Sequence, residues 1–158
     1  MRGVAITDRD VYEAIAPGLM RFATALAGPS DAADVVSAVV VRVLGKRTLS
    51  SLEKPEAYLM QAVMNEVRQL HRGRNRQRAA VVRIGPGPSA RDTAEIARTD
   101  LTDAVMSLPA QQRAAAYLVY WCDYTAPEVA ELMGWSGGTV RRYLHLVRTK
   151  LGRFADER

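Results

Sequence analysis

Apolar residues recur every three or four positions along most of the chain, a spacing that places them on one face of an α-helix. In the first half this spacing predicts three helices, at about residues 7–26, 30–44 and 55–78. Pro17 is expected to kink or split the first, whereas Pro55 suits the first turn of the third. The second helix is apolar on several sides, with six valines, and is expected at the centre of a bundle. No useful length of sequence alternates as a β-strand does.

After the third helix the composition changes. Residues 84–90 read IGPGPSA, which cannot continue a helix and is typical of a linker. Beyond it the pattern predicts four more helices, a short one, one opened by Pro109 and two at the end. The sequence therefore predicts an all-α fold in which two small helical domains, residues 1–78 and 100–158, are joined by a flexible linker, residues 79–99.

The last two predicted helices have the pattern of a helix-turn-helix. Thr125 and Glu128 have the T-x-x-E spacing of a capping box, which begins the first of the pair. Gly134 stands where that helix must end, since glycine tolerates a left-handed backbone, and Ser136 can cap the next helix. Such a short turn makes the two helices cross steeply, as in DNA-binding motifs. The predicted buried face of the second helix is Val140, Leu144, Val147 and Leu151.

The other positions of this second helix are polar or basic, and no acidic residue occurs between Glu131 and Asp156. A basic helix suits the major groove of DNA, with its first residues near base edges and its arginines near phosphates. The alternative is an ordinary surface helix with a solvated basic face. The polar and basic positions are Thr139, Arg141, Arg142, His145, Arg148 and Lys150.

The formal net charge of +5 is unevenly distributed. Residues 68–78, at the end of the third helix, contain five arginines and no acid. With the last helix they make two separate basic patches, which favours contact with a polyanion at two places. The alternative for the first patch is a solvated helix end that the helix dipole stabilises.

The sequence also argues against several functions. It lacks the ~20-residue apolar run of a membrane span, and residues 1–10 lack the apolar core of a signal peptide, so a cytoplasmic protein without membrane insertion is expected. Cys122 and the two histidines are far apart, so no metal site is predicted, and Cys122 is expected in or near the core. No phosphate loop or nucleophile–base pair is visible, so neither catalytic residues nor a cofactor are expected.

The aromatic residues bear on strand opening, which requires exposed rings or pockets that receive flipped bases. Tyr58 lies in phase with Val63 and Leu70 and is expected to be a core contact. Trp121, Tyr124 and Trp135 are also expected to be packing residues.

Two stretches of the second half match a known pattern. Residues 107–113 read SLPAQQR, and residues 128–134 read EVAELMG, followed by the GTV of residues 138–140. They resemble the C-terminal domain of the extracytoplasmic-function (ECF) group of bacterial sigma factors, in the sigma-70 family. The resemblance implies that the last helix reads the minus-thirty-five element of a promoter. The DNA contacts that it implies there are Ser136, Thr139, Arg141, Arg142, His145 and Arg148.

The first half resembles the same family at two places. Residues 30–36, SDAADVV, are similar to the stretch that grips the clamp helices of RNA polymerase, although Ser37 and Ala38 stand where a glutamine and an acid are usual. The third helix, which begins with the PEAYL of residues 55–59, is similar to the one that opens and reads the minus-ten element. The implied polymerase contacts are Asp34, Ser37, Ala38 and Arg42, and the further implied DNA contacts are Asn65, Arg68, Gln69 and Arg72.

The resemblance therefore implies an ECF sigma factor that binds core RNA polymerase and directs promoter-specific transcription initiation. Its implied partners are core RNA polymerase, promoter DNA and an anti-sigma factor. Two alternatives stay open. One is a helix-turn-helix transcription regulator that acts without polymerase, and the other is a sigma-like interaction protein that has lost promoter melting.

Overall fold

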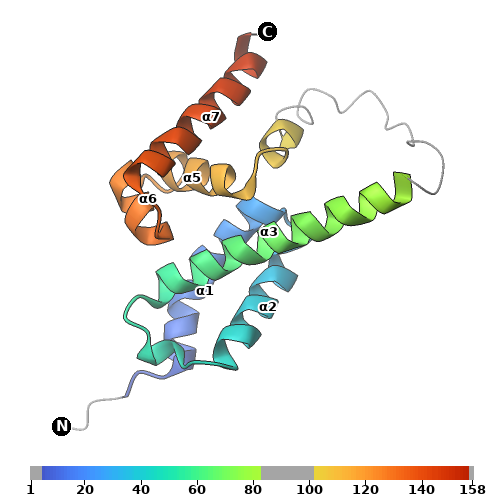
Figure 1. Cartoon of the computed structure of the whole chain (residues 1–158). Coiled ribbons are helices and arrows are strands. Elements are labelled where there is room, and N and C mark those ends of the chain that lie inside the picture. The colour runs from blue at the N-terminus through green and yellow to red at the C-terminus, as the bar shows by residue number, and fades with distance from the viewer. Residues whose placement is uncertain (1–4, 83–101, 157–158) are drawn as a thin grey trace.

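The computed structural model describes residues 5–82 and 102–156, and every regular element in these two ranges is a helix (Figure 1). The all-α class predicted from the sequence is confirmed for them. The predicted linker, residues 79–99, lies outside the described residues except for positions 79–82, which continue the third helix. The elements in chain order are α1 (Asp8–Ala27), α2 (Ala32–Leu44), the 3-10 helix η1 (Leu49–Ser51), α3 (Pro55–Val82), a short helix at 102–106, α5 (Ala110–Tyr120), α6 (Ala126–Met133) and α7 (Gly137–Asp156).

Helix α1 begins with a capping box and passes through a proline. The backbone N–H of Thr7 donates to the Asp10 carboxylate at 2.8 Å, and the backbone N–H of Asp10 donates to the Thr7 hydroxyl at 3.2 Å. Of the kink or split expected at Pro17, the split is wrong, because α1 runs unbroken through this residue. Leu19 and Phe22, beyond the proline, are fully buried. Each such burial stabilises by about 1.5–3 kcal/mol, which offsets the ~3 kcal/mol that an interior proline costs.

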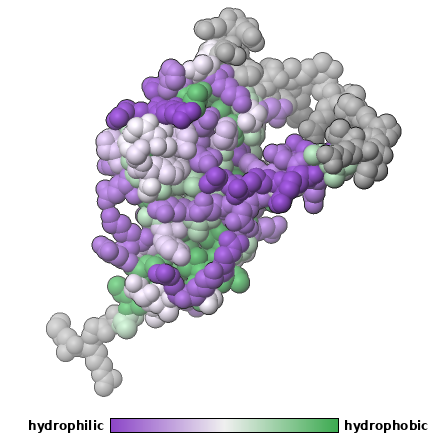
Figure 2. All heavy atoms as spheres, in the orientation of Figure 1, coloured by the Kyte–Doolittle hydropathy of each residue, from purple (hydrophilic) through white to green (hydrophobic). Residues whose placement is uncertain are grey.

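Helix α2 buries only one of its faces, against α1 and α3. Its opposite face is exposed, with 73% of Val41 and 45% of Leu44 accessible to solvent. The expectation that this helix is central to a bundle is therefore wrong, since α2 lies at an edge of the N-terminal half (Figure 1). Figure 2 shows hydrophobic residues on this part of the surface. The buried residues of α2 are Ala32, Val35, Val36, Val39 and Val43.

The C-terminal half contains the predicted helix-turn-helix. Helix α6 begins with its capping box, in which the backbone N–H of Thr125 donates to the Glu128 carboxylate at 2.7 Å. Gly134 ends α6 in the left-handed conformation, with φ 67° and ψ 31°. The Ser136 hydroxyl accepts from the backbone N–H of Thr139 at 3.1 Å, which caps α7. On the predicted buried face of α7, Val140, Leu144 and Val147 are buried and Leu151 is half-buried.

The two halves pack against each other, α1 and α3 on one side and α5 and α6 on the other (Figure 1). The ring centroids of Phe22 in α1 and Tyr117 in α5 are 6.2 Å apart. The side-chain amide of Gln61 in α3 donates to the carbonyl oxygen of Leu132 in α6 at 2.9 Å. The C-terminal part of α3 projects beyond this packed region (Figure 1). Independent folding of the two predicted domains stays a prediction.

Candidate nucleic-acid interface

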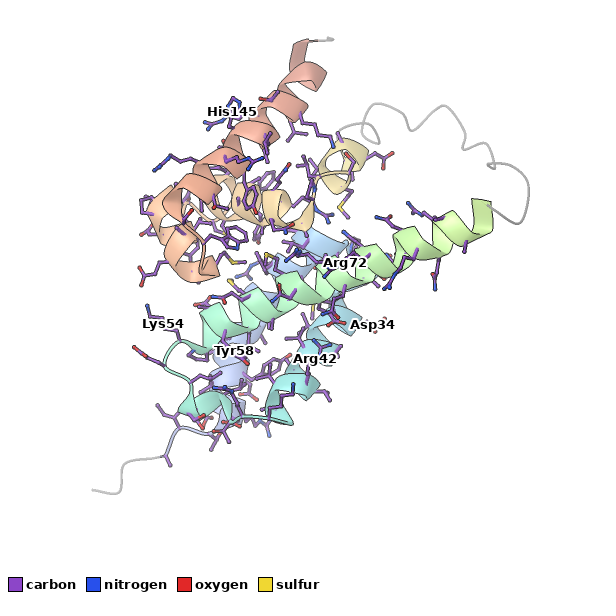
Figure 3. All side chains as sticks on the ribbon, viewed as in Figure 1. Asp34, Arg42, Lys54, Tyr58, Arg72 and His145 are labelled. Carbon is purple, nitrogen blue, oxygen red and sulfur yellow. The ribbon has the colours of Figure 1, made fainter. Side chains whose placement is uncertain are left out.

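The face of α7 that points away from the core carries the basic side chains predicted to contact DNA. Arg141, Arg142, His145 and Arg148 are all exposed, and Figure 3 shows His145 on the outer side of the helix. The opposite face of α7 packs on α5 and α6. The fold therefore turns the basic face toward solvent, and no acidic residue interrupts it over residues 137–152.

Ser136 and Thr139, two more of the predicted DNA contacts, cap the helix. Their hydroxyl oxygens are 2.8 Å apart, and Thr139 is half-buried. Because both hydroxyls are engaged locally, they fix the N-terminus of α7. The first backbone amides of α7, beside Gly137 and Gly138, point outward from that end and suit contact with a phosphate.

A small packed cluster fixes the angle between α6 and α7. Val129 is fully buried, and Ala130 allows close approach because its side chain is small and only 8% exposed. Trp135 in the turn meets Tyr143 of α7 edge to face, with centroids 5.3 Å apart and an interplanar angle of 83°. The expected packing role of Trp135 is confirmed. The basic face of α7 is thus held by a rigid pair of helices.

The C-terminal half of α3 is the second basic surface, and Figure 2 shows it as a hydrophilic arm. Asn65, Gln69 and Arg72 are exposed, as predicted for side chains that contact DNA. Gln69 and Arg72 line, with Asn75 and Arg76, a surface hollow of about 660 Å³. The hollow carries two arginines and two amides, a set of donors suited to phosphate and base edges.

Two other arginines of this surface are engaged within the molecule. Arg74 donates through both terminal nitrogens to the Asp31 carboxylate, at 2.7 and 2.8 Å. These hydrogen bonds hold the pKa of Asp31 below its usual value and raise the pKa of Arg74. Arg68 is half-buried and faces Gln111 of α5, whose side-chain oxygen accepts from Nε at 2.9 Å when the amide is turned toward it. Arg68 therefore lies at the contact between the halves.

The outward face of α2 carries most of the predicted polymerase contacts. Asp34, Ser37 and Ala38 are exposed, whereas Arg42 forms an ion pair with Glu66 of α3 and helps fix α2 to that helix (Asp34 and Arg42 are labelled in Figure 3). Sequence reasoning missed the two most apolar members of this face, Val41 and Leu44. The sequence did contain a signal for them, because α2 has more apolar positions than one helix face can hold. A helix at an edge of the bundle buries only one face. We call these residues the α2 face: Asp34, Ser37, Ala38, Val41 and Leu44.

Arg113 is the one charged side chain that is buried among the described residues, with 2% of its surface exposed. Its Nη2 lies 3.2 Å from His71 Nδ1, and its Nη1 lies 3.2 Å from the sulfur of Met106. Its Nε has no hydrogen-bond partner among the described residues. Burial lowers the pKa of Arg113 to about 10. Burial and then the charges of Arg113 and Arg74 lower the pKa of His71.

Several side chains expected in the core are exposed. Trp121 is 80% exposed and Cys122 is also exposed, so both expectations are wrong. Both follow the end of α5, where the chain turns through Asp123 with φ 56° and leaves the core. Tyr58 is 39% exposed and lies 6.0 Å beneath the Arg47 guanidinium, so it is only partly a core contact, and Tyr124 is half-buried.

No group of three or more histidine, cysteine, aspartate or glutamate side chains within the described ranges could hold a metal ion. No helix among those residues is long and apolar enough to cross a membrane.

A helical fold whose helix-turn-helix presents an unbroken basic face defines a DNA-binding protein of the helix-turn-helix class. Residues 98–151, which include α5, α6 and most of α7, match the family model described as "Sigma-70, region 4". A solved structure with similar architecture is that of the sigma factor RpoE in complex with the anti-sigma factor NepR from Bartonella quintana. It is 22% identical, with a TM-score of 0.66, and the match covers 94% of this chain and 96% of that chain. No curated protein sequence matches the chain.

These findings confirm the resemblance drawn from the sequence. Residues 98–151 are similar to region 4 of the sigma-70 family, and the fold of the chain is similar to that of the solved sigma factor.

Proposed function

We propose that the protein binds core RNA polymerase and directs it to specific promoters, as a sigma factor that is itself a binding protein and not an enzyme. The observation that carries the proposal is the exposed, acid-free basic face of α7 within the region-4 match. In this role α7 enters the major groove of the minus-thirty-five element, with Arg141 and Arg142 nearest to the DNA. The protein then works in the cytoplasm, where polymerase and promoter are.

The α2 face supports the polymerase contact. Val41 and Leu44 are exposed beside the small residues Ser37 and Ala38, and Asp34 lies at the other end of the same helix. Burying two such aliphatic side chains against a partner gains about 1.5–3 kcal/mol each. Small neighbours allow a partner helix to approach closely. This face therefore suits docking against a helix pair of the polymerase.

Binding one promoter with both basic surfaces requires the halves to separate. The minus-ten and minus-thirty-five elements lie about 25 base pairs apart, on the order of 85 Å along B-DNA at ~3.4 Å per pair. Here α3 and α7 both pack against α5, which brings the two surfaces much closer than that. Contacts between the halves, such as the 2.7 Å ion pair from Lys54 to Glu131, must then break on the promoter.

One observation favours the second candidate, a sigma-like interaction protein that has lost promoter melting. Arg68, one of the predicted minus-ten contacts, faces Gln111 across the contact between the halves. If the halves stay together, Arg68 is not free for DNA. A protein partner of the anti-sigma kind fits either candidate, and the structural neighbour is itself a sigma factor in complex with an anti-sigma factor.

The test is transcription with purified core polymerase on a promoter library. We expect the protein to select a set of promoters that core polymerase alone does not transcribe, and the double variant Arg141→Ala with Arg142→Ala to lose that selection. If neither polymerase binding nor transcription is found while specific duplex binding persists, the plain regulator is the correct function. If polymerase binds but no promoter is opened, the interaction protein is correct.

The α2 face is tested in the same assay. Ser37→Gln with Ala38→Glu restores the polar pair usual in the family, and both residues are exposed, so the fold is retained. We expect the swap to strengthen core polymerase binding and to leave duplex binding by the protein alone unchanged. Val41→Ser with Leu44→Ser is expected to weaken polymerase binding. Equal polymerase binding by all three proteins would remove the α2 face from the proposal.

A further inference from the structure

His71 and Arg113 meet across the contact between the two halves of the molecule. His71 belongs to α3 and Arg113 to α5, and these two helices pack against each other. Nη2 of Arg113 lies 3.2 Å from Nδ1 of His71 and 3.5 Å from its Nε2. His71 is half-buried there, and Arg113 is buried. A change of charge at this contact would therefore act on the packing of one half against the other.

The buried guanidinium of Arg113 depends on His71 for a hydrogen-bond acceptor. Among the described residues its other side-chain partner is the sulfur of Met106, a weak acceptor, and its Nε has none. A neutral imidazole has one unprotonated nitrogen that can accept, whereas an imidazolium has none. Protonation of His71 therefore removes this acceptor and places a second positive charge beside a buried one, which is unfavourable.

The charged groups that act most on His71 come from both halves. They are Arg113 of α5, Arg74 of α3 and Asp31 at the N-cap of α2. Asp31 opposes the two arginines, but its carboxylate is already paired with both terminal nitrogens of Arg74. Since Asp31, Arg74 and His71 belong to the same half, they stay together when the halves separate. Of the three charges, separation removes only that of Arg113.

The closed arrangement therefore binds a proton at His71 less readily than an open one. Burial is the largest cause that lowers the pKa of His71, and the charge of Arg113 is the next. Separation uncovers the ring on the side that faces α5, so its pKa should return toward the ordinary value near 6.5. By linkage, a fall in pH below about 6.5 favours the open arrangement until the closed-state pKa is passed.

Among the described side chains at this contact, His71 is the one whose charge changes near neutral pH. The chain has two histidines, and the other, His145, is exposed on the outer side of α7 (Figure 3). Lys54 and Glu131 also join the halves, but their hydrogen bond raises the pKa of Lys54 and lowers the pKa of Glu131. Both of those values move away from neutrality.

We propose that the contact between His71 and Arg113 is a proton-sensitive latch, which holds the two halves closed while the imidazole is neutral and weakens when the imidazole is protonated. Other contacts, such as the hydrogen bond from Gln61 to the Leu132 carbonyl oxygen, hold the halves at every pH. Acidification therefore shifts the balance toward the open arrangement. The consequence, that lower pH favours promoter engagement, rests on the proposed function. The latch itself does not.

Single-molecule FRET on the full chain measures the opening. One dye is attached to the exposed native thiol of Cys122, after α5, and the other to a cysteine that replaces the exposed Lys46, between α2 and η1. We expect the ratio of open to closed molecules to rise at least about twofold between pH 7.5 and pH 5.5. His71→Gln keeps a polar side chain that does not titrate, so this rise should be absent from the variant.

Two further variants locate the response. His145→Gln removes the histidine that lies away from the contact, and we expect it to open on acidification as the wild type does. His71→Lys carries a positive charge at both pH values, so it should already be more open than the wild type at pH 7.5 and change little at pH 5.5. Circular dichroism at both pH values checks that the helices persist, so that the FRET change reports opening.

An equal rise in wild type and His71→Gln would overturn the proposal, and so would a chain that is open at both pH values. If the wild type is closed at both, the measurement is repeated with Lys54→Ala and Gln61→Ala, which remove two other contacts between the halves. The lack of a pH response in that background would also overturn it.

The FRET assay contains neither polymerase nor DNA, so its failure leaves the proposed function intact. Transcription at the two pH values tests the consequence of the latch alone. Because polymerase itself responds to pH, the measured quantity is the activity of the wild type relative to that of His71→Gln. We expect this ratio to rise on acidification. A latch that responds in the FRET assay without such a rise would show that opening does not limit promoter engagement.

Discussion

The outward face of α7 and the C-terminal half of α3 are both basic helices predicted to contact DNA, yet the fold uses their arginines differently. On α7, Arg141, Arg142 and Arg148 are all exposed. On α3, Arg74 is paired with Asp31 and Arg68 faces the other half of the molecule. A run of basic residues in the sequence therefore does not by itself define a binding surface, because contacts within the fold engage some of those residues.

The largest expected effect is the difference in DNA affinity between variants of the α7 surface and variants of the α3 surface. Replacing Arg141 and Arg142 by alanine should weaken duplex binding by about 1–3 kcal/mol for each arginine that reads a base. The matched pair, Arg72→Ala with Arg76→Ala, removes the same charge from α3, and we expect it to cost less than about 1 kcal/mol in the free protein. Electrophoretic titration at two salt concentrations measures both. Equal losses from the two pairs would contradict the distinction between the surfaces.

Replacing two glycines by alanine, one in the turn before α7 and one inside α3, should change the free energy of unfolding with opposite sign. Gly134 has φ 67°, and an L-residue in this conformation costs roughly 1–2 kcal/mol, so Gly134→Ala should destabilise the protein. Gly73 lies inside α3, and a Cβ added there meets nothing within 4 Å. Gly73→Ala should therefore stabilise it by up to about 1 kcal/mol, since alanine favours the helix.

Urea unfolding followed by circular dichroism measures both glycine variants. Destabilisation by Gly73→Ala would show that this glycine has a role in α3 beyond a helix interior. A neutral Gly134→Ala would mean that the turn between α6 and α7 relaxes more easily than its backbone conformation indicates.

The difference between local pattern and long-range contacts also explains which features the sequence could predict. The capping box of Thr125 and Glu128, the left-handed Gly134 and the cap at Ser136 each depend on residues within four positions, so local pattern was sufficient. Whether Pro17 splits a helix depended instead on burial of Leu19 and Phe22 against distant helices. Such contacts become visible only after the helices have packed.

The residues of the candidate site were likewise predictable only where local pattern was sufficient. The exposed arginines of α7 were identified because one helix has only one face left for them once its apolar stripe is buried. The exposure of Trp121 was not predictable, because it depends on where α5 ends and the chain leaves the core. The burial of Arg113 was not predictable, because it depends on how the two halves meet. The pairing of Arg74 with Asp31 joins α3 to the N-cap of α2 and could not be predicted from the spacing of the sequence.

A smaller effect concerns the ion pair between Arg74 and Asp31. Both side chains are partly exposed, so the pair should contribute only about 0.2–1 kcal/mol, and Arg74→Ala should lower stability by that amount at neutral pH. The pKa of Asp31 is lowered in the folded protein, so this contribution is present above the unfolded pKa near 3.9 and is lost as the pH falls through the folded pKa. Unfolding of both proteins at pH 7 and at lower pH measures the difference, which should shrink on acidification. Arg72→Ala, without such a partner among the described residues, is the control.

The smallest expected effect tests how the halves meet, through His71. Burial, Arg113 of α5 and Arg74 of α3 lower the pKa of His71, and Asp31 opposes them only in part. The unfolded chain takes up this proton near pH 6.5, but the folded protein takes it up only at lower pH. The unfolded state therefore binds more protons in that window, and stability should fall as the pH drops below about 6.5 until the folded pKa is passed. His71→Gln keeps a polar side chain without a titrating ring, so the loss of stability between pH 7.5 and pH 5.5 should be smaller in the variant than in the wild type. Urea unfolding at the two pH values measures this difference. An identical pH dependence in both proteins would show that burial and the neighbouring arginines do not lower the pKa of His71.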